Sequence, residues 1–187
     1  DRLASLPARD QARKLLGWDA QSTVVLAVAR LSAEKGIDLL APLANRSNVR
    51  VVVAGDGPLR GKLETMNIEF LGARNDVPLL MAAADIVVVP SRSEGLGLVA
   101  IEAAAAGRPV VATRTGGLPE VVEDQWTGLL VPPDNPEAIV DAVESLRVNP
   151  DLCARLGDRA RQRALRCFSR ESMWHATDRV YKRILQP

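Results

Sequence analysis

Two glutamates, Glu94 and Glu102, stand in one short stretch with seven residues between them. Residues 86–89 are apolar and precede Glu94. Glu94 itself stands in a turn that contains glycines, and a helical pattern begins before Glu102. If the apolar segment is a strand of an open α/β sheet, both carboxylates lie near its carboxyl end, where ligands bind. The residue types alone leave three uses open: general acid and base, metal ligands, or acceptors for the hydroxyls of a ligand.

A pair of cations follows the first apolar segment of the chain. Arg30 comes directly after residues 23–29, and Lys35 stands at the start of the next helical pattern. A strand end that leads into a helix N-terminus attracts anions through free backbone amides and the helix dipole. Arg30, as a planar fork, and Lys35, as a point charge, would hold a diphosphate across this loop. The competing interpretation is ordinary surface charge.

The residue types give little support to metal or nucleophile chemistry. His175 is the only histidine, and no Asp-x-Asp pair is present to hold a divalent ion against a diphosphate. Ser91 and Ser93 have no histidine or lysine close in sequence to activate them. We therefore expect no metal ion and no other cofactor.

The turn between the two glutamates contains a weak dinucleotide-binding pattern. Residues 95–100 fit the spacing G-x-G-x-x-A. Two features argue against a nicotinamide or a flavin. Residues 90–94 separate these glycines from the strand, and residues 112–115, Ala-Thr-Arg-Thr, stand where an acid is expected at the end of the next strand.

Three further loops are expected to open onto the same edge of the sheet. Residues 54–58, Ala-Gly-Asp-Gly-Pro, form a turn after the second apolar segment, and residues 115–120 form another glycine turn. Residues 70–74 end the third strand. In that loop, the backbone from Gly72 onward would meet a nucleobase edge and Arg74 would cover the ring.

The rest of the chain alternates between apolar, β-branched runs and helical patterns. Strands are expected at residues 23–29, 49–54, 68–71, 86–89, 109–112 and 128–131. Helices or helical turns are expected at residues 7–16, 35–44, 58–66, 77–84, 97–106, 118–123, 136–147, 150–166 and 170–185. This alternation predicts one α/β domain over residues 1–187, with a Rossmann-like, doubly wound, mostly parallel sheet and a helical C-terminal tail.

Length and composition narrow the function class. The chain has 187 residues, of which 47% are hydrophobic and 25% charged, as in globular domains. The net charge of +1 and the aromatic content of 3% argue against a nucleic-acid partner. No apolar stretch is long enough to span a bilayer, no signal peptide is evident, and the two cysteines are expected to be reduced. A cytoplasmic location is therefore expected. The first residue, Asp1 instead of Met, suggests a fragment or a processed piece.

Six segments, taken in order, resemble the C-terminal, nucleotide-sugar-binding half of the group 1 (family 4) glycosyltransferases, enzymes of the two-Rossmann GT-B architecture. The resemblance runs from about Val24 to Val143. It rests on Ala-Arg-Leu-Ser-Ala-Glu-Lys-Gly (29–36), Ala-Gly-Asp-Gly-Pro (54–58), Phe-Leu-Gly (70–72), residues 84–98, residues 102–112 and Gly-Gly-Leu-Pro-Glu-Val-Val (116–122), continued by Thr-Gly-Leu-Leu-Val-Pro-Pro (127–133). One such segment would be weak, whereas six in order are specific.

The resemblance implies a donor site and a role for each residue in it. Arg30 and Lys35 would hold the donor diphosphate and offset the charge that develops as it leaves. Glu94 would bond the hydroxyls of the donor sugar, and these three are the expected catalytic residues. Glu102 would bond the ribose hydroxyls. The other donor contacts would come from the backbone of Gly95, Gly97 and Leu98 and, at the base, from the loop of Gly72 and Arg74.

The resemblance also implies a mechanism and a partner. Members of the family work without a metal ion and retain the anomeric configuration, by front-face displacement in which the leaving phosphate helps to deprotonate the acceptor. They carry an N-terminal Rossmann domain that binds the acceptor, and little precedes the first strand here. We therefore expect this chain to bind a UDP- or GDP-sugar and to transfer little alone.

The expected partner is that missing N-terminal domain. Residues 170–185 would correspond to the family's last helix, which crosses back to that domain. A lipid or polysaccharide acceptor would fit, with the full-length protein at the inner membrane face in the lipid case. Two alternatives stay open, a non-catalytic nucleotide-binding regulatory module and a GT-B sugar-nucleotide epimerase.

Overall fold

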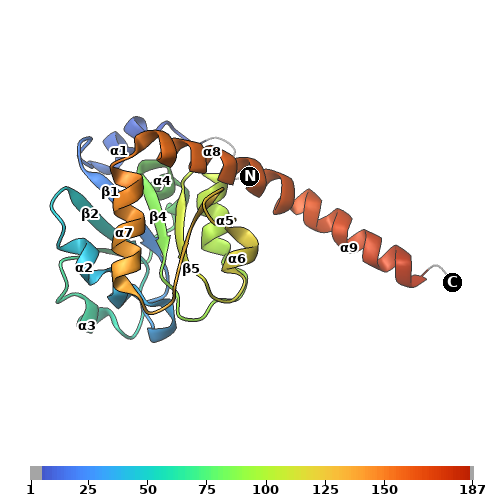
Figure 1. The fold of residues 1–187 in the computed structure, drawn as a ribbon, viewed down its shortest axis with the longest axis horizontal. Coiled ribbons are helices and arrows are strands. Elements are labelled where there is room, and N and C mark those ends of the chain that lie inside the picture. The colour runs from blue at the N-terminus through green and yellow to red at the C-terminus, as the bar shows by residue number, and fades with distance from the viewer. Residues whose placement is uncertain (1–5, 186–187) are drawn as a thin grey trace.

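The computed structural model describes residues 6–185, so residues 1–5 and 186–187 of the predicted domain lie outside the described residues. Six strands form one sheet with helices on both faces (Figure 1). The strands are β1 (Thr23–Val28), β2 (Val49–Ala54), β3 (Glu69–Gly72), β4 (Ile86–Val89), β5 (Val110–Thr113) and β6 (Gly128–Val131). Every neighbouring pair in this sheet is parallel, which confirms the predicted α/β class.

The helices alternate with these strands along the chain. They are α1 (Arg9–Leu16), α2 (Ala41–Ala44), α3 (Arg60–Leu63), α4 (Val77–Ala83), α5 (Leu98–Ala105), α6 (Leu118–Val121), α7 (Pro136–Arg147), α8 (Pro150–Cys167) and α9 (Arg170–Leu185), with 3₁₀ turns η1 (Ala33–Lys35) and η2 (Ile37–Leu40). Asn135 and Asn149 cap α7 and α8, because each side chain accepts a hydrogen bond from the amide three residues later. A proline follows each cap at the first helical position, where no amide hydrogen is needed.

The strand order is β3-β2-β1-β4-β5-β6, which is the doubly wound order. The chain winds outward from β1 to β3 and then returns to place β4 on the other side of β1. The connections that follow β1 and β4 therefore diverge, and a crevice opens between them at the carboxyl ends of the strands. The predicted catalytic residues all lie on these two connections.

The central strands are buried on both faces, as their continuous apolar runs predict. On β1, Val25 faces a core that it shares with Ile139 of α7. The next residue toward the N-terminus, Val24, faces the opposite core together with Leu80 of α4 and Ala100 of α5. Since both faces are packed, the strands are fixed in register and their ends give a rigid edge for the loops.

Two predicted helices differ from the structure. The helix predicted at residues 58–66 forms only over α3 (Arg60–Leu63), with turns on either side, and the other is interrupted. Residues 35–44 do not form a continuous helix; the chain makes two 3₁₀ turns before the short helix α2. Gly36 separates the two turns with a left-handed φ of 62°. A Cβ atom at this position would lie 2.2 Å from the carbonyl oxygen of Pro90. The helix is interrupted because Gly36 lets the connection after β1 approach the loop after β4.

The predicted C-terminal helical tail is confirmed as α9, which extends away from the sheet (Figure 1). It has 16 residues, and none of them is buried. Large apolar side chains along its length are exposed, among them Met173, Trp174, Tyr181 and Ile184. α9 therefore contributes little to the core of this domain.

Candidate functional site

A cavity of about 480 Å³ lies at the crevice between the connections that follow β1 and β4. The residues that line it include Arg30, Lys35, Glu94, Gly97 and Leu98. The structure thus brings together the three residues predicted to be catalytic and the start of α5. Gly95 belongs to the same loop, although it is not among the residues that line the cavity.

Lys35 and Glu94 form an ion pair inside this cavity. The Nζ atom of Lys35 lies 2.9 Å from Oε2 of Glu94, and the two side chains are 26% and 15% exposed. Ser91 donates from Oγ to the same Oε2 atom at 3.1 Å, and the amide of Gly95 donates to Oε1 at 3.2 Å. The carboxylate of Glu94 is therefore oriented by a cation, a hydroxyl and an amide. Its remaining lone pairs are available to a hydroxyl-bearing ligand.

Arg30 lies at the solvent-exposed side of the same cavity. Within residues 6–185, no carboxylate lies at ion-pair distance from its guanidinium group. The pKa of the neighbouring Glu34 is lowered by a hydrogen bond from Ser32 and, to a smaller extent, by the charge of Arg30. Arg30 and Lys35 both reach the cavity from the connection that follows β1. Within the described residues, the guanidinium group of Arg30 has no ion-pair partner, whereas the ammonium group of Lys35 pairs with Glu94. Two cations at one cavity favour a doubly charged anion such as a diphosphate.

The start of α5 adds backbone donors to this cavity. The first hydrogen bonds of the helix are donated by the amides of Ala100 and Ile101 to the carbonyl oxygen of Gly97. The amides of Leu98 and Val99, which precede them, have no acceptor within the helix. Gly97 adopts φ 79°, and the side chain of Leu118 packs so close that a Cβ atom would lie 2.6 Å from it. This helix end is therefore suited to bind an anion.

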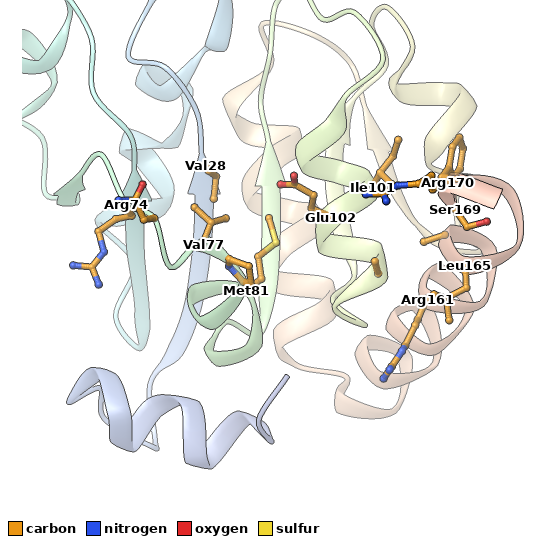
Figure 2. Close-up of a pocket in the computed structure, with 15 residues that line it drawn as sticks. Val28, Arg74, Val77, Met81, Ile101, Glu102, Arg161, Leu165, Ser169 and Arg170 are labelled. Atoms are coloured by element: carbon orange, nitrogen blue, oxygen red, sulfur yellow. The ribbon is translucent and has the colours of Figure 1, made fainter. Parts of the chain in front are cut away.

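A second cavity, of about 570 Å³, adjoins the first at Val28 and extends along α4 and α5. Glu102, on α5, lies in its wall with its carboxylate directed toward Val28 (Figure 2). Desolvation by the surrounding wall raises the pKa of Glu102 above its ordinary value. Met81 and Ile101 supply apolar surface nearby. A carboxylate beside an apolar surface is suited to a nucleoside, which has both hydroxyls and a flat ring.

The predicted base-binding loop has only one of its two residues at this cavity. Arg74 lies at the rim, but its guanidinium group points away from Glu102 (Figure 2) and pairs with Asp76 through two hydrogen bonds of 2.8 and 2.6 Å. Gly72 lines neither cavity, and its carbonyl oxygen accepts a hydrogen bond from the amide of Gly55. Asn75, which the sequence analysis passed over, lines the cavity instead. Its only sequence signal is its place directly after Arg74.

Glycines fix the spacing of the loops around the site. A Cβ atom at Gly116 would lie 1.8 Å from the carbonyl oxygen of Glu94, and one at Gly117 would lie 2.4 Å from that of Gly95. The loop after β5 therefore packs backbone to backbone against the loop that carries Glu94. The glycine turn at residues 115–120 thus packs against the loop of Glu94 and does not line the first cavity.

None of the helices in the described part of the chain combines the length and the apolar character that a membrane span requires.

Comparison with known proteins identifies the family and agrees with the fold. The family described as Glycosyl transferases group 1 matches residues 8–163. A D-inositol 3-phosphate glycosyltransferase of Corynebacterium glutamicum is 38% identical in an alignment that covers 91% of this chain and 44% of that protein. Sucrose-phosphate synthase from Thermosynechococcus elongatus superposes with a TM-score of 0.87 at 30% identity, over 97% of this chain and 50% of that one. HepE of Anabaena, solved with UDP-glucose, superposes with a TM-score of 0.83 at 28% identity, over 92% of this chain and 52% of that one.

The chain spans about half the length of the curated relatives it matches. Its structural neighbours are GT-B glycosyltransferases, and the named relatives include inositol phosphate and kanosaminyl transferases. With a match over residues 8–163 and a doubly wound sheet whose crevice carries the expected side chains, the chain belongs to the group 1 glycosyl transferases.

Proposed function

We propose that this chain is the donor-binding half of a retaining, metal-independent glycosyltransferase that uses a nucleotide-diphospho-sugar. The observation that carries the proposal is the Lys35–Glu94 pair at the sheet crevice, with the free amides of α5 beside it and Glu102 in the adjoining cavity. The solved complexes of HepE with UDP and UDP-glucose support a nucleotide-sugar as the ligand class.

Each part of the donor has a matching environment in this proposal. The nucleoside enters the larger cavity, where Glu102 accepts hydrogen bonds from the ribose hydroxyls. The diphosphate lies between Arg30, Lys35 and the amide of Leu98. The sugar lies in the first cavity beside the loop of Glu94, and Glu94 accepts hydrogen bonds from its hydroxyls. Asn75 is the side chain in place to contact the base, since Asp76 holds Arg74 at the rim.

The transfer step follows from these contacts. The bond between the anomeric carbon and the diphosphate oxygen breaks, and a bond to the acceptor oxygen forms on the same face of the sugar. The acceptor proton passes to the leaving phosphate oxygen. Negative charge grows on the diphosphate as it leaves, and Arg30, Lys35 and the start of α5 stabilise it in the place where a metal ion would otherwise act. Glu94 orients the sugar throughout.

The acceptor site belongs, in this proposal, to a second Rossmann domain outside this chain. The exposed apolar side chains of α9 support that part, because an unburied apolar helix face is typical of a surface that another domain covers. The acceptor class proposed is a lipid or a polysaccharide. The site of action proposed is the cytoplasm, at the inner membrane face for a lipid acceptor.

Titration calorimetry on the 187-residue chain tests the donor half of the proposal. We expect UDP-glucose, GDP-mannose or their nucleotides to bind with a Kd below the millimolar range. The double variant Arg30→Ala/Lys35→Ala should weaken UDP or GDP by about a hundredfold, because two charge-assisted contacts to the diphosphate are lost.

No binding of any nucleotide at millimolar concentration would refute the proposal, and an unchanged affinity in the double variant would refute the phosphate assignment. Product analysis on the full-length protein separates the remaining candidates. A transferase releases nucleoside diphosphate and forms a glycoside, an epimerase changes the sugar alone, and a regulatory module does neither.

A further inference from the structure

Arg92 joins the two connections that form the site, although its own side chain lines neither cavity. Its Nη1 and Nη2 atoms donate to the two carboxylate oxygens of Asp38, each at 2.8 Å. Its Nη1 atom also donates to the carbonyl oxygen of Ala33 at 2.9 Å, and its Nε atom donates to Asp134. One guanidinium group therefore holds the segment around Lys35, the loop of Glu94 and the loop after β6.

Backbone contacts run beside this side chain. The amides of Arg92 and Ser93 donate to the carbonyl oxygen of Glu34 at 2.8 and 3.3 Å. The hydroxyl of Thr115 donates to the carbonyl oxygen of Arg92 at 3.2 Å. The turn that carries Lys35 and the loop that carries Glu94 thus touch along their length, and Arg92 closes that contact from the outside.

The bidentate contact between Arg92 and Asp38 is strong for a site near the surface. The side chains are 30% and 38% exposed. The hydrogen bonds from Arg92 hold the pKa of Asp38 below its ordinary value, and those to Asp38 and Asp134 raise the pKa of Arg92. Paired planar groups of this kind fix orientation as well as distance, which a single point charge does not.

The two residues of the Lys35–Glu94 pair lie on opposite sides of the sheet crevice. Lys35 follows β1 and Glu94 follows β4, and they meet at 2.9 Å only if the two connections keep their relative position. We infer that Arg92 is a positioning residue: through Asp38 it fixes Lys35 and Glu94 relative to each other, so that the phosphate-binding cation and the sugar-binding carboxylate engage one donor molecule. This inference rests on the proposed function.

The nucleoside cavity provides an internal reference. Glu102 and Met81 lie on α5 and α4, and none of the contacts of Arg92 reaches either helix. Loss of Arg92 should therefore reduce the affinity gained from the diphosphate and from the sugar, while leaving the affinity for the nucleoside monophosphate in place. A general loss of structure would weaken all ligands alike.

The experiment compares Kd values for UMP, UDP and UDP-glucose, or for GMP, GDP and GDP-mannose if the wild-type chain prefers guanosine. In Arg92→Ala we expect the gain from monophosphate to diphosphate to fall by about tenfold to a hundredfold, the range that one charge-assisted contact contributes. The monophosphate Kd should stay within about twofold, as for a distant independent site. Asp38→Asn should act in the same direction, and Arg92→Lys should not restore the gain.

Arg114→Ala is the matched control, because Arg114 forms an exposed ion pair with Asp124 on the loop after β5 and joins neither connection. A double-mutant cycle completes the test. If Arg92 acts through Lys35, then Arg92→Ala should change UDP affinity by less than about twofold in a Lys35→Ala background. Circular dichroism and thermal unfolding identify any variant that fails to fold, and Asp38→Asn then serves in its place.

The outcomes separate the inference from the proposed function. Equal weakening of all three ligands in folded Arg92→Ala, or an unchanged gain from monophosphate to diphosphate, would overturn the positioning role while leaving donor binding intact. Additive effects of Arg92→Ala and Lys35→Ala would overturn it as well. Wild-type chain that binds no nucleotide would overturn both.

Discussion

Glu94 and Glu102 are the same residue type in the same stretch of chain, yet their surroundings are opposite. Glu94 is held by Lys35, Ser91 and the amide of Gly95. The carboxylate of Glu102 has no hydrogen-bond or ion-pair partner within the described residues, and desolvation raises its pKa. Glu94 is thus preorganised by its neighbours, whereas Glu102 depends on a ligand for its partners. The two halves of the proposed donor site differ in how much of their structure exists before binding.

The largest expected effect is that of Gly116→Ala, which should disturb the loop of Glu94 and leave the surroundings of Glu102 unchanged. A Cβ atom there would lie 1.8 Å from the carbonyl oxygen of Glu94, and Gly116 has a left-handed φ of 52°. We expect a loss of about 2–3 kcal/mol in the free energy of unfolding, from backbone strain and overpacking. Chemical denaturation measures it.

Gly95→Ala is the control for that prediction, because no atom lies within 4 Å of a Cβ atom built on Gly95. It should change the free energy of unfolding by less than about 1 kcal/mol. Equal losses in the two variants would show that the close contact at Gly116 does not stabilise the loop.

The next prediction compares which ligands are weakened by Glu94→Ala and which by Glu102→Ala. Glu94→Ala should weaken UDP-glucose by about tenfold or more and leave UMP nearly unchanged, because its proposed partner is the sugar. Glu102→Ala should weaken UMP, UDP and UDP-glucose by a similar factor, because its proposed partner is the ribose they share. Calorimetric titration of the six combinations decides. If each variant weakens all three ligands equally, the division of roles between Glu94 and Glu102 is wrong.

The smallest expected effect is on pH dependence. Ribose hydroxyls donate to an ionised carboxylate, so binding favours the charged form of Glu102 and lowers its pKa. Since the pKa of Glu102 is raised in the free protein, nucleotide affinity should be full above that raised pKa and should decline as the pH falls through it. UMP titrations between about pH 4 and 7 should show a change of a few fold per pH unit at most. Glu102→Gln should flatten the curve, and an identical slope in that variant would assign the proton elsewhere.

Sequence patterns located the sheet and its crevice well. The strands at residues 49–54, 86–89 and 128–131 have the predicted bounds, because strands buried on both faces must be continuously apolar and end where polar loops begin. The meeting of Lys35 with Glu94 follows from the same logic, since carboxyl ends of neighbouring parallel strands share one edge.

What the sequence did not reveal depends on contacts between distant segments. The predicted helix at residues 35–44 is broken by the approach of Gly36 to Pro90, a contact across 54 positions that no local periodicity contains. The pairing of Arg74 with Asp76 was also not predicted, because a cation two residues before a carboxylate is common in charged loops and carries no specific signal. Arg92 was not singled out from the sequence, because its partner Asp38 lies 54 positions away and no local pattern joins the two.

The glycine contacts between the loops have a consequence for how this domain can change. Gly36, Gly116 and Gly117 let main-chain atoms of the loops approach closely, and the side chain of Arg92 adds contacts between the same loops. Side chains that make neither kind of contact are not needed for the loop spacing. Leu96, which lines the first cavity and is 47% exposed, is one such side chain. Substitutions at Leu96 should change the lining of the first cavity, the proposed sugar site, without shifting the loops that hold Lys35 and Glu94. Under the proposed function, such a scaffold would let donor preference diversify while the proposed phosphate contacts stay constant.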